Sequence, residues 1–267
     1  IYIYWFLYIY VFVCLCIDHE NVREIQSRLF DKNIVTYGLS PKADFFPKNV
    51  KLVQRKKNYY TSFDVMINRK KKYELKNLLI PSLGIHNLKN VLGAISVAIN
   101  IGIKKSDIKK ALLNFKGVKR RFTLVYSNNN NKVFDDYAHH PIEISATLSA
   151  MREITKGKII VIFEPHRYSR LKELFSDFVK CFKNSDILFV LPVFPAGEKK
   201  IKPYTNKYLV NSILNNNNNN NNIFCVDKPL PLFNNIKKVL LPNDNVIFLG
   251  AGPITKLAYL FSEYLDK

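Results

Sequence analysis

Cysteine is scarce in this sequence, and its pattern does not suit a metal site. The 267 residues include four cysteines, Cys14, Cys16, Cys181 and Cys225. No pair has Cys-x-x-Cys spacing and no histidine cluster accompanies them, so the common zinc sites are excluded. We therefore expect reduced thiols in a cytoplasmic protein, and no metal ligands among these residues.

Acidic residues are also few. Asp and Glu number 21 against 41 Lys and Arg, which gives a formal net charge of +20. Such an excess commonly indicates nucleic acid or an anionic surface as the partner. The excess is mostly scattered lysine, and no familiar nucleic-acid-binding module is visible. We expect no nucleic-acid partner. A basic protein that binds nucleic acid or a membrane surface is the alternative.

The sequence has no apolar run of the length that a typical membrane-spanning helix needs. The uncharged run at residues 1–17 falls short of the roughly 20 residues required. It is rich in Tyr, Ile, Val and Phe, which favour strands. We expect a buried strand over residues 10–17, with Asp18 beginning the next helix, and no stable membrane insertion. A membrane anchor is the alternative.

The remaining pattern predicts an α/β protein. Before residue 117 we expect a helix over residues 20–30, strands at residues 34–38 and within residues 50–79, and two helices that end near residues 101 and 115. Beyond it, apolar strands are expected at residues 132–134, 158–163, 187–191, 223–226 and 246–249. Helices are expected between and after them, at residues 142–151, 169–182, 206–214, 230–240 and 254–265. This alternation predicts a doubly wound, parallel sheet.

The chain is organised around Asp-Asp-Tyr-Ala-His-His-Pro at residues 135–141. This stretch follows a strand and precedes a helix, and open α/β sheets bind ligands at such carboxyl ends of strands. Its acids, phenol and imidazoles suit holding a ribose, stacking on a base and moving a proton; the candidates are Asp136, Tyr137, His139 and His140. In the alternative interpretation, Asp135 or Asp136 only caps the helix and the histidines are exposed.

Two other stretches carry groups suited to anions or nucleotides. Asn87 and Asn90 fall in the first turn of a helix, where their amides suit a phosphate oxygen or an adenine edge. Capping of that helix by Asn87 is the alternative. His166, Arg167 and Arg170 follow the strand at residues 158–163. Two guanidiniums with an imidazole suit a carboxylate.

These stretches resemble the motifs of the Mur ligases. Residues 135–141 are similar to the signature of the members that join L-alanine to UDP-N-acetylmuramate, and residues 84–90, 117–122 and 165–170 agree with other motifs in order and spacing. The resemblance runs from about residue 10 to the end. It implies the remainder of a central ATPase domain over residues 1–116 and a Rossmann-like C-terminal domain over residues 117–267.

The resemblance also implies a reaction and roles. The reaction is the ATP-dependent, ADP-forming ligation of L-alanine to UDP-N-acetylmuramate through an acyl phosphate, in peptidoglycan precursor synthesis. ATP would be held by Asn87, Asn90, Asp136, Tyr137 and one of Arg120 and Arg121. His139 or His140 would face the muramyl substrate, and L-alanine would meet His166, Arg167 and Arg170, with Glu198 as a wall of the cleft.

The sequence departs from the family in two respects. It contains no Gly-x-x-x-x-Gly-Lys-(Ser/Thr) loop, the backbone cradle for phosphates. After Gly250 and Gly252 it has Pro253-Ile254-Thr255 where the family has Asp-Ile-Gly, which puts a polar contact there in doubt. We expect a C-terminal part that is inactive alone. The UDP-binding domain and most Mg²⁺ ligands would lie upstream or on a separate N-terminal half. A non-catalytic nucleotide- or amino-acid-binding module is the alternative.

Overall fold

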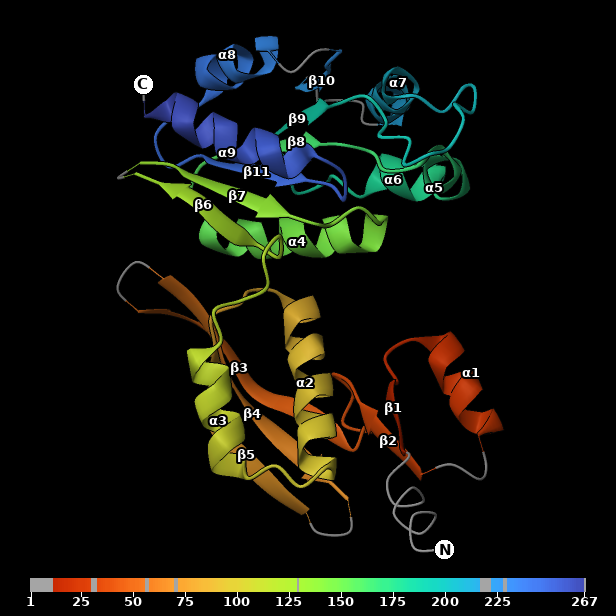
Figure 1. The fold of residues 1–267 in the computed structure, drawn as a ribbon, viewed down its shortest axis with the longest axis vertical. Coiled ribbons are helices and arrows are strands. Elements are labelled where there is room, and N and C mark those ends of the chain that lie inside the picture. The colour runs from red at the N-terminus through yellow and green to blue at the C-terminus, as the bar shows by residue number, and fades with distance from the viewer. Residues whose placement is uncertain are drawn as a thin grey trace, which may run out of the picture. The chain divides into compact units, whose positions relative to one another are not determined.

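The structure, a computed structural model, consists of two compact units, residues 1–116 and residues 117–267 (Figure 1). It describes residues 12–29, 33–55, 58–69, 72–128, 130–216, 222–227 and 230–266. Most of the apolar run at residues 1–17 therefore lies outside the described residues.

The first unit contains a sheet in the order β1-β2-β3-β4-β5. Its strands are β1 (Phe12–Cys16), β2 (Asn33–Tyr37), β3 (Phe45–Arg55), β4 (Asn58–Asn68) and β5 (Lys72–Ile80). β1 and β2 are parallel, and β3 to β5 form an antiparallel meander. The predicted strand at residues 10–17 is confirmed over Phe12–Cys16, but its five residues are half-buried and not buried as expected.

Of the three helices that the structure describes in this unit, two cover the sheet. They are α2 (Ile85–Asn100) and α3 (Lys105–Asn114), which follow α1 (Glu20–Arg28). In α2 the apolar residues Leu88, Leu92 and Ile95 recur at helical spacing, so one stripe of the helix packs on the strands. The buried partners on the sheet include Phe45 and Phe63.

Asp18 does not begin α1 as the sequence predicted. His19 is the N-cap residue, and its Nδ1 accepts a hydrogen bond from the Asn21 N–H at 3.2 Å. The Asp18 carboxylate instead accepts the Leu39 N–H at 2.9 Å and lies 3.0 Å from Lys89 Nζ. A carboxylate already bonded on both sides is unavailable as a cap, and here it joins β1 to the turn after β2 and to α2.

The second unit contains a sheet in the order β10-β9-β8-β11-β7-β6. Its strands are β6 (Thr123–Ser127), β7 (Lys132–Asp136), β8 (Ile159–Phe163), β9 (Ile187–Val190), β10 (Ile223–Cys225) and β11 (Asn245–Leu249). All neighbours are parallel except β6 and β7, which form a hairpin. The predicted doubly wound α/β fold is confirmed, with one antiparallel strand at its edge.

Helices cover both faces of this sheet. They are α4 (Pro141–Ile154), α5 (Tyr168–Glu173), α6 (Phe175–Lys180), α7 (Asn206–Asn216), α8 (Leu230–Val239) and α9 (Ile254–Leu265). α8 and α9 lie on one face and α4 on the other (Figure 1). Every side chain of β8 is buried, because successive residues point to opposite faces and each face carries helices. Phe163 packs on Phe178 of α6, whereas Ile162 belongs to the cluster under α8 and α9.

The predicted single helix at residues 169–182 is in fact two short helices. The chain departs from helical geometry at Leu174, where φ is −111° and ψ is 24°. α5 ends before this residue and α6 begins after it. Among the described residues, no helix combines the length and the apolar character that crossing a bilayer requires.

Core packing generates a stability prediction for the second unit. Phe261 of α9 is fully buried, whereas its neighbour Leu260 is 50% exposed. Phe261→Ala should lower the free energy of unfolding by about 3–5 kcal/mol, because it removes a packed ring and leaves a cavity. Leu260→Ala, the matched control in the same helix, should cost about 0.5 kcal/mol or less. Urea unfolding followed by circular dichroism measures both, and equal losses would contradict the packing described.

Candidate functional site

The carboxyl ends of four parallel strands form a row in the second unit. Val190 pairs with Phe163, Phe163 with Leu249, and Leu249 with Asp136. The segments that follow these strands therefore start side by side. They carry all the candidate residues after residue 122, and this edge of a parallel sheet is where ligands bind in such folds.

The two acids at the end of β7 are buried and engaged. Asp136 accepts the N–H groups of Phe122 and Ala138, both at 2.7 Å, and burial raises its pKa to about 6. Asp135 accepts the Thr255 hydroxyl at 3.2 Å, and burial raises its pKa as well. Both carboxyl groups thus shape the turn. Thr255, where a polar contact was in doubt, supplies one.

Neither acid caps α4. His140 is the N-cap residue, and its Nδ1 accepts the Ile142 N–H at 3.4 Å. Glu143 completes a capping box, since its Oε2 accepts the N–H groups of His139 and His140. Both histidines are half-buried. The alternative in which an aspartate caps the helix and the histidines are exposed is therefore wrong.

Four aromatic rings run along the edge. The ring centroids of Tyr137 and His139 are 5.1 Å apart, those of His139 and His166 5.9 Å, and those of His166 and Phe194 5.4 Å. The rings come from the segments after β7, β8 and β9. The His139 Nδ1 lies 2.8 Å from the Tyr137 carbonyl oxygen. A proton on Nδ1 for that bond leaves Nε2 as an acceptor.

Cations flank the two imidazoles. Arg170 Nη1 lies 3.3 Å from His166 Nδ1 and donates to the His166 carbonyl oxygen at 3.1 Å. Burial, followed by the Arg170 charge, lowers the pKa of His166. Burial is also the main cause of the lowered pKa of His139, with Arg170 and Arg121 adding to it. Neutral imidazoles beside guanidiniums form an electropositive patch that suits an anion.

Glu198 fixes the turn that carries Arg167. Its carboxylate accepts the Ser169 N–H at 3.0 Å and the Ser169 hydroxyl at 2.6 Å. Arg167 has a φ of 72°, unusual for a residue with a side chain, and its N–H donates to the Phe194 carbonyl oxygen at 2.9 Å. The loops after β8 and β9 are thus joined, and Glu198 lies at this junction.

The two neighbouring arginines have different environments. Arg120 donates through Nη2 to the carbonyl oxygens of Gly250 and Gly252, at 2.7 and 3.0 Å, and its Cζ lies 4.6 Å from the centre of the Tyr137 ring. Arg121 Cζ lies 5.6 Å from the same ring. Among the described residues, only Arg120 of the pair has its guanidinium hydrogen-bonded.

The two glycines after β11, Gly250 and Gly252, leave room for Glu164 of the same chain. A Cβ at Gly250 would lie 3.0 Å from the Glu164 carbonyl oxygen, and one at Gly252 would collide with the Glu164 carboxylate. The sequence predicted a close backbone approach here but not its partner. Glu164 and Phe194 were both missed. Glu164 had a signal, as the first polar residue after a wholly apolar strand, whereas Phe194 had none.

Asn87 and Asn90 belong to the first unit. Gly84, with a φ of 86°, is the N-cap residue of α2, so the alternative that Asn87 caps the helix is wrong. Asn87 is buried, and its Nδ2 donates to the Leu83 carbonyl oxygen at 2.7 Å. Asn90 is exposed. The described residues contain no cluster of three or more His, Cys, Asp or Glu side chains that could hold a metal ion.

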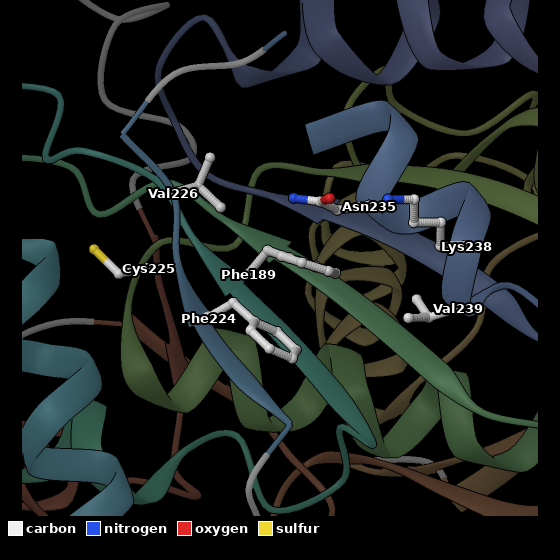
Figure 2. Close-up of a pocket in the computed structure, with 7 residues that line it drawn as sticks. All are labelled: Phe189, Phe224, Cys225, Val226, Asn235, Lys238 and Val239. Atoms are coloured by element: carbon white, nitrogen blue, oxygen red, sulfur yellow. The ribbon is translucent and has the colours of Figure 1, made fainter. Parts of the chain in front are cut away.

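A cavity of about 310 Å³ lies elsewhere in the second unit, between β9, β10 and α8 (Figure 2). Its lining is mainly apolar, with Phe189, Phe224, Val226 and Val239 beside Cys225, Asn235 and Lys238. None of the predicted site residues lines it. The candidate site is therefore defined by the converging side chains at the strand ends and not by this cavity.

Comparison with known proteins identifies the family. Residues 120–252 match the family model described as Mur ligase, glutamate ligase domain. The UDP-N-acetylmuramate–L-alanine ligase of Agrobacterium fabrum is 41% identical over 245 residues, which cover 91% of this chain and 51% of that protein. The Bartonella henselae enzyme of the same name is 42% identical, over 91% of this chain and 50% of that protein. The chain belongs to the Mur ligase family and spans about half the length of these curated relatives.

Solved structures agree with this fold. The UDP-N-acetylmuramate-alanine ligase of Thermotoga maritima superimposes with a TM-score of 0.69 at 27% identity, over 91% of this chain and 50% of that one. The MurF ligase of Thermotoga maritima in complex with ADP gives a TM-score of 0.68 at 16% identity, over 95% of this chain and 53% of that one. At that identity the second likeness concerns the fold alone.

The cationic surroundings of the imidazoles generate a titration prediction. Arg170→Met should raise the pKa of both His166 and His139, because a positive charge that opposes their protonation is removed. Lys172→Met, which removes an exposed cation of the same helix, should have a much smaller effect. NMR titration of the imidazole carbons measures both values. An unchanged pKa for His166 in Arg170→Met would contradict the arrangement.

Proposed function

We propose that this chain is the C-terminal part of an ATP-dependent, ADP-forming ligase that joins L-alanine to UDP-N-acetylmuramate, in cytoplasmic peptidoglycan precursor synthesis. The observation that carries the proposal is the pair of imidazoles, His139 and His166, flanked by Arg170 at the edge of the sheet. The names of the relatives at 41% and 42% identity support the choice of substrates.

In the proposed reaction, the lactyl carboxylate must first be activated before the amine of L-alanine can attack it. ATP transfers its terminal phosphoryl group to the lactyl carboxylate of UDP-N-acetylmuramate, and ADP leaves. The amine of L-alanine then attacks the acyl phosphate, the new amide forms, and phosphate leaves with the electron pair of the broken C–O bond. Cationic groups stabilise charge that develops on the phosphate and carbonyl oxygens. Arg121 is the proposed cation at the phosphate, because Arg120 already holds two carbonyl groups.

The amino acid would bind where the loops after β7 and β8 meet. His166, Arg167 and Arg170 would hold the L-alanine carboxylate, and Glu198 would fix the turn on which Arg167 stands. His139 or His140 would face the muramyl substrate. The neutral imidazole of His139 is an acceptor for the proton that the attacking amine must lose.

Asn87, Asn90 and Tyr137 are the proposed contacts for the nucleotide, and Asp136 would act through the turn that it holds. This sequence has no phosphate-binding glycine and lysine loop. We propose that this loop, the UDP-binding domain and most of the Mg²⁺ ligands belong to a preceding segment or a separate N-terminal half.

A chimaera tests the proposed function. The first half of the Agrobacterium fabrum relative, joined in frame to this chain, should release ADP only when both L-alanine and UDP-N-acetylmuramate are present, whereas this chain alone should release none. ADP release by the chain alone would contradict the proposal that this chain is inactive without an N-terminal half. If a folded chimaera binds ATP but does not release ADP in response to the two substrates, the proposed ligase function is wrong. L-Alanine binding to the isolated chain without ATP would favour the amino-acid-binding module.

Arg170 provides a kinetic prediction in the same chimaera. Arg170→Met should raise the KM for L-alanine by about 10-fold or more, the value of one charge-assisted hydrogen bond. The KM for UDP-N-acetylmuramate should change little, because that substrate does not depend on the amino-acid carboxylate site. Lys172→Met is the matched control. Equal effects on both KM values would show that Arg170 does not select the amino acid.

A further inference from the structure

Glu164 is a buried carboxyl group that the proposed reaction does not use. It follows β8 directly and is 8% exposed. Its Oε1 has no hydrogen-bond partner among the described residues, and the Ile254 N–H interacts with the carboxylate at the start of α9. Burial raises its pKa to about 7, whereas the Arg120 charge opposes that rise. An unsatisfied buried carboxylate is costly unless its charge is balanced.

Arg120 has a complementary feature. Its Nη2 donates to the carbonyl oxygens of Gly250 and Gly252, but its buried Nε has no acceptor in the part of the chain that the structure describes. Asp135 is the other carboxyl group influenced by the Arg120 charge. The carboxylate of Glu164 and the guanidinium of Arg120 thus both border the short loop between β11 and α9.

This loop has the form of an anion-binding turn. It joins a strand to the N-terminus of a helix of 12 residues and contains two glycines, and its N-cap residue, Pro253, makes no side-chain hydrogen bond. Such turns commonly bind phosphate, because the helix dipole and the N–H groups favour negative charge. Here a Cβ at Gly252 would collide with the Glu164 carboxylate, so the protein's own anion occupies this space.

We propose that Glu164 is a built-in anion: it takes the anion position at the N-terminus of α9 and balances Arg120, which in turn holds the loop against Tyr137. Glu164 is thus a positioning residue. It explains why Gly252 is required, because a Cβ there would collide with the Glu164 carboxylate. It also explains why Arg120 is committed to the loop while Arg121 is left for a ligand. The proposal does not rest on the ligase activity and is tested on the chain itself.

Chemical rescue is the first test. Glu164→Ala should lower the melting temperature by about 5–10 °C, because Arg120 and the N-terminus of α9 lose their balancing charge. Formate, which fits the vacated position, should restore a substantial part of that loss, and chloride at equal ionic strength should not. Glu173→Ala, at an exposed glutamate of α5, should show neither effect. Equal effects of formate on the wild type and on Glu164→Ala would overturn the proposal.

A double-mutant cycle is the second test, and it does not depend on formate entering the space that Glu164→Ala vacates. Glu164→Gln and Arg120→Met should each lower the melting temperature, because the first removes the charge that balances the half-buried Arg120 and the second leaves the buried Glu164 without this cation. The double variant should lose clearly less than the sum. In Arg120→Met, NMR titration should also show the pKa of Glu164 higher than in the wild type. Additive losses, or an unchanged pKa, would mean that the two groups are not a pair.

Discussion

The parallel pairing of β7, β11, β8 and β9 is the constraint on which the candidate site depends. Parallel strands in register end together, so Asp136, Leu249, Phe163 and Val190 form a row. Each following segment then starts beside its neighbour, although Asp136 and Leu249 are 113 positions apart in the sequence. Helices on both faces keep the sheet buried, which leaves its carboxyl edge as the place where polar groups collect.

Burial of charge decides what the polar groups at this edge can do. Asp135, Asp136 and Glu164 are nearly inaccessible, and the two aspartates accept hydrogen bonds from backbone or side-chain donors, so they determine the shape of the loops. The imidazoles of His139 and His166 lie beside guanidiniums and are held neutral. The edge thus separates an inner set of anions from an outer set of cations and neutral acceptors. This is a suitable arrangement for an anionic substrate.

Two adjacent arginines illustrate the same separation. Arg120, with a φ of 61°, turns its guanidinium towards the loop between β11 and α9. Arg121 remains near the Tyr137 ring without being committed to that loop. Neighbouring positions on an irregular segment point in different directions, so identical side chains can have one structural and one ligand-facing role.

The sequence alone determined the α/β class, the alternation of strands and helices from residue 132 onwards, and the stretches that carry the candidate site. Short apolar strands alternate with amphipathic helices, and the spacing of apolar residues along the chain predicts both. Asp-Asp-Tyr-Ala-His-His-Pro is recognised from its position at the end of a predicted strand. Both features are local in the sequence. It was wrong about Asp18 as a helix start and about one helix over residues 169–182. Only the tertiary structure decided that the Glu164 carboxylate lies against Gly252, that Phe194 stacks on His166, and that Arg120 is hydrogen-bonded to the glycine loop while Arg121 is not. These facts depend on contacts between segments brought together by strand register, which no local pattern encodes.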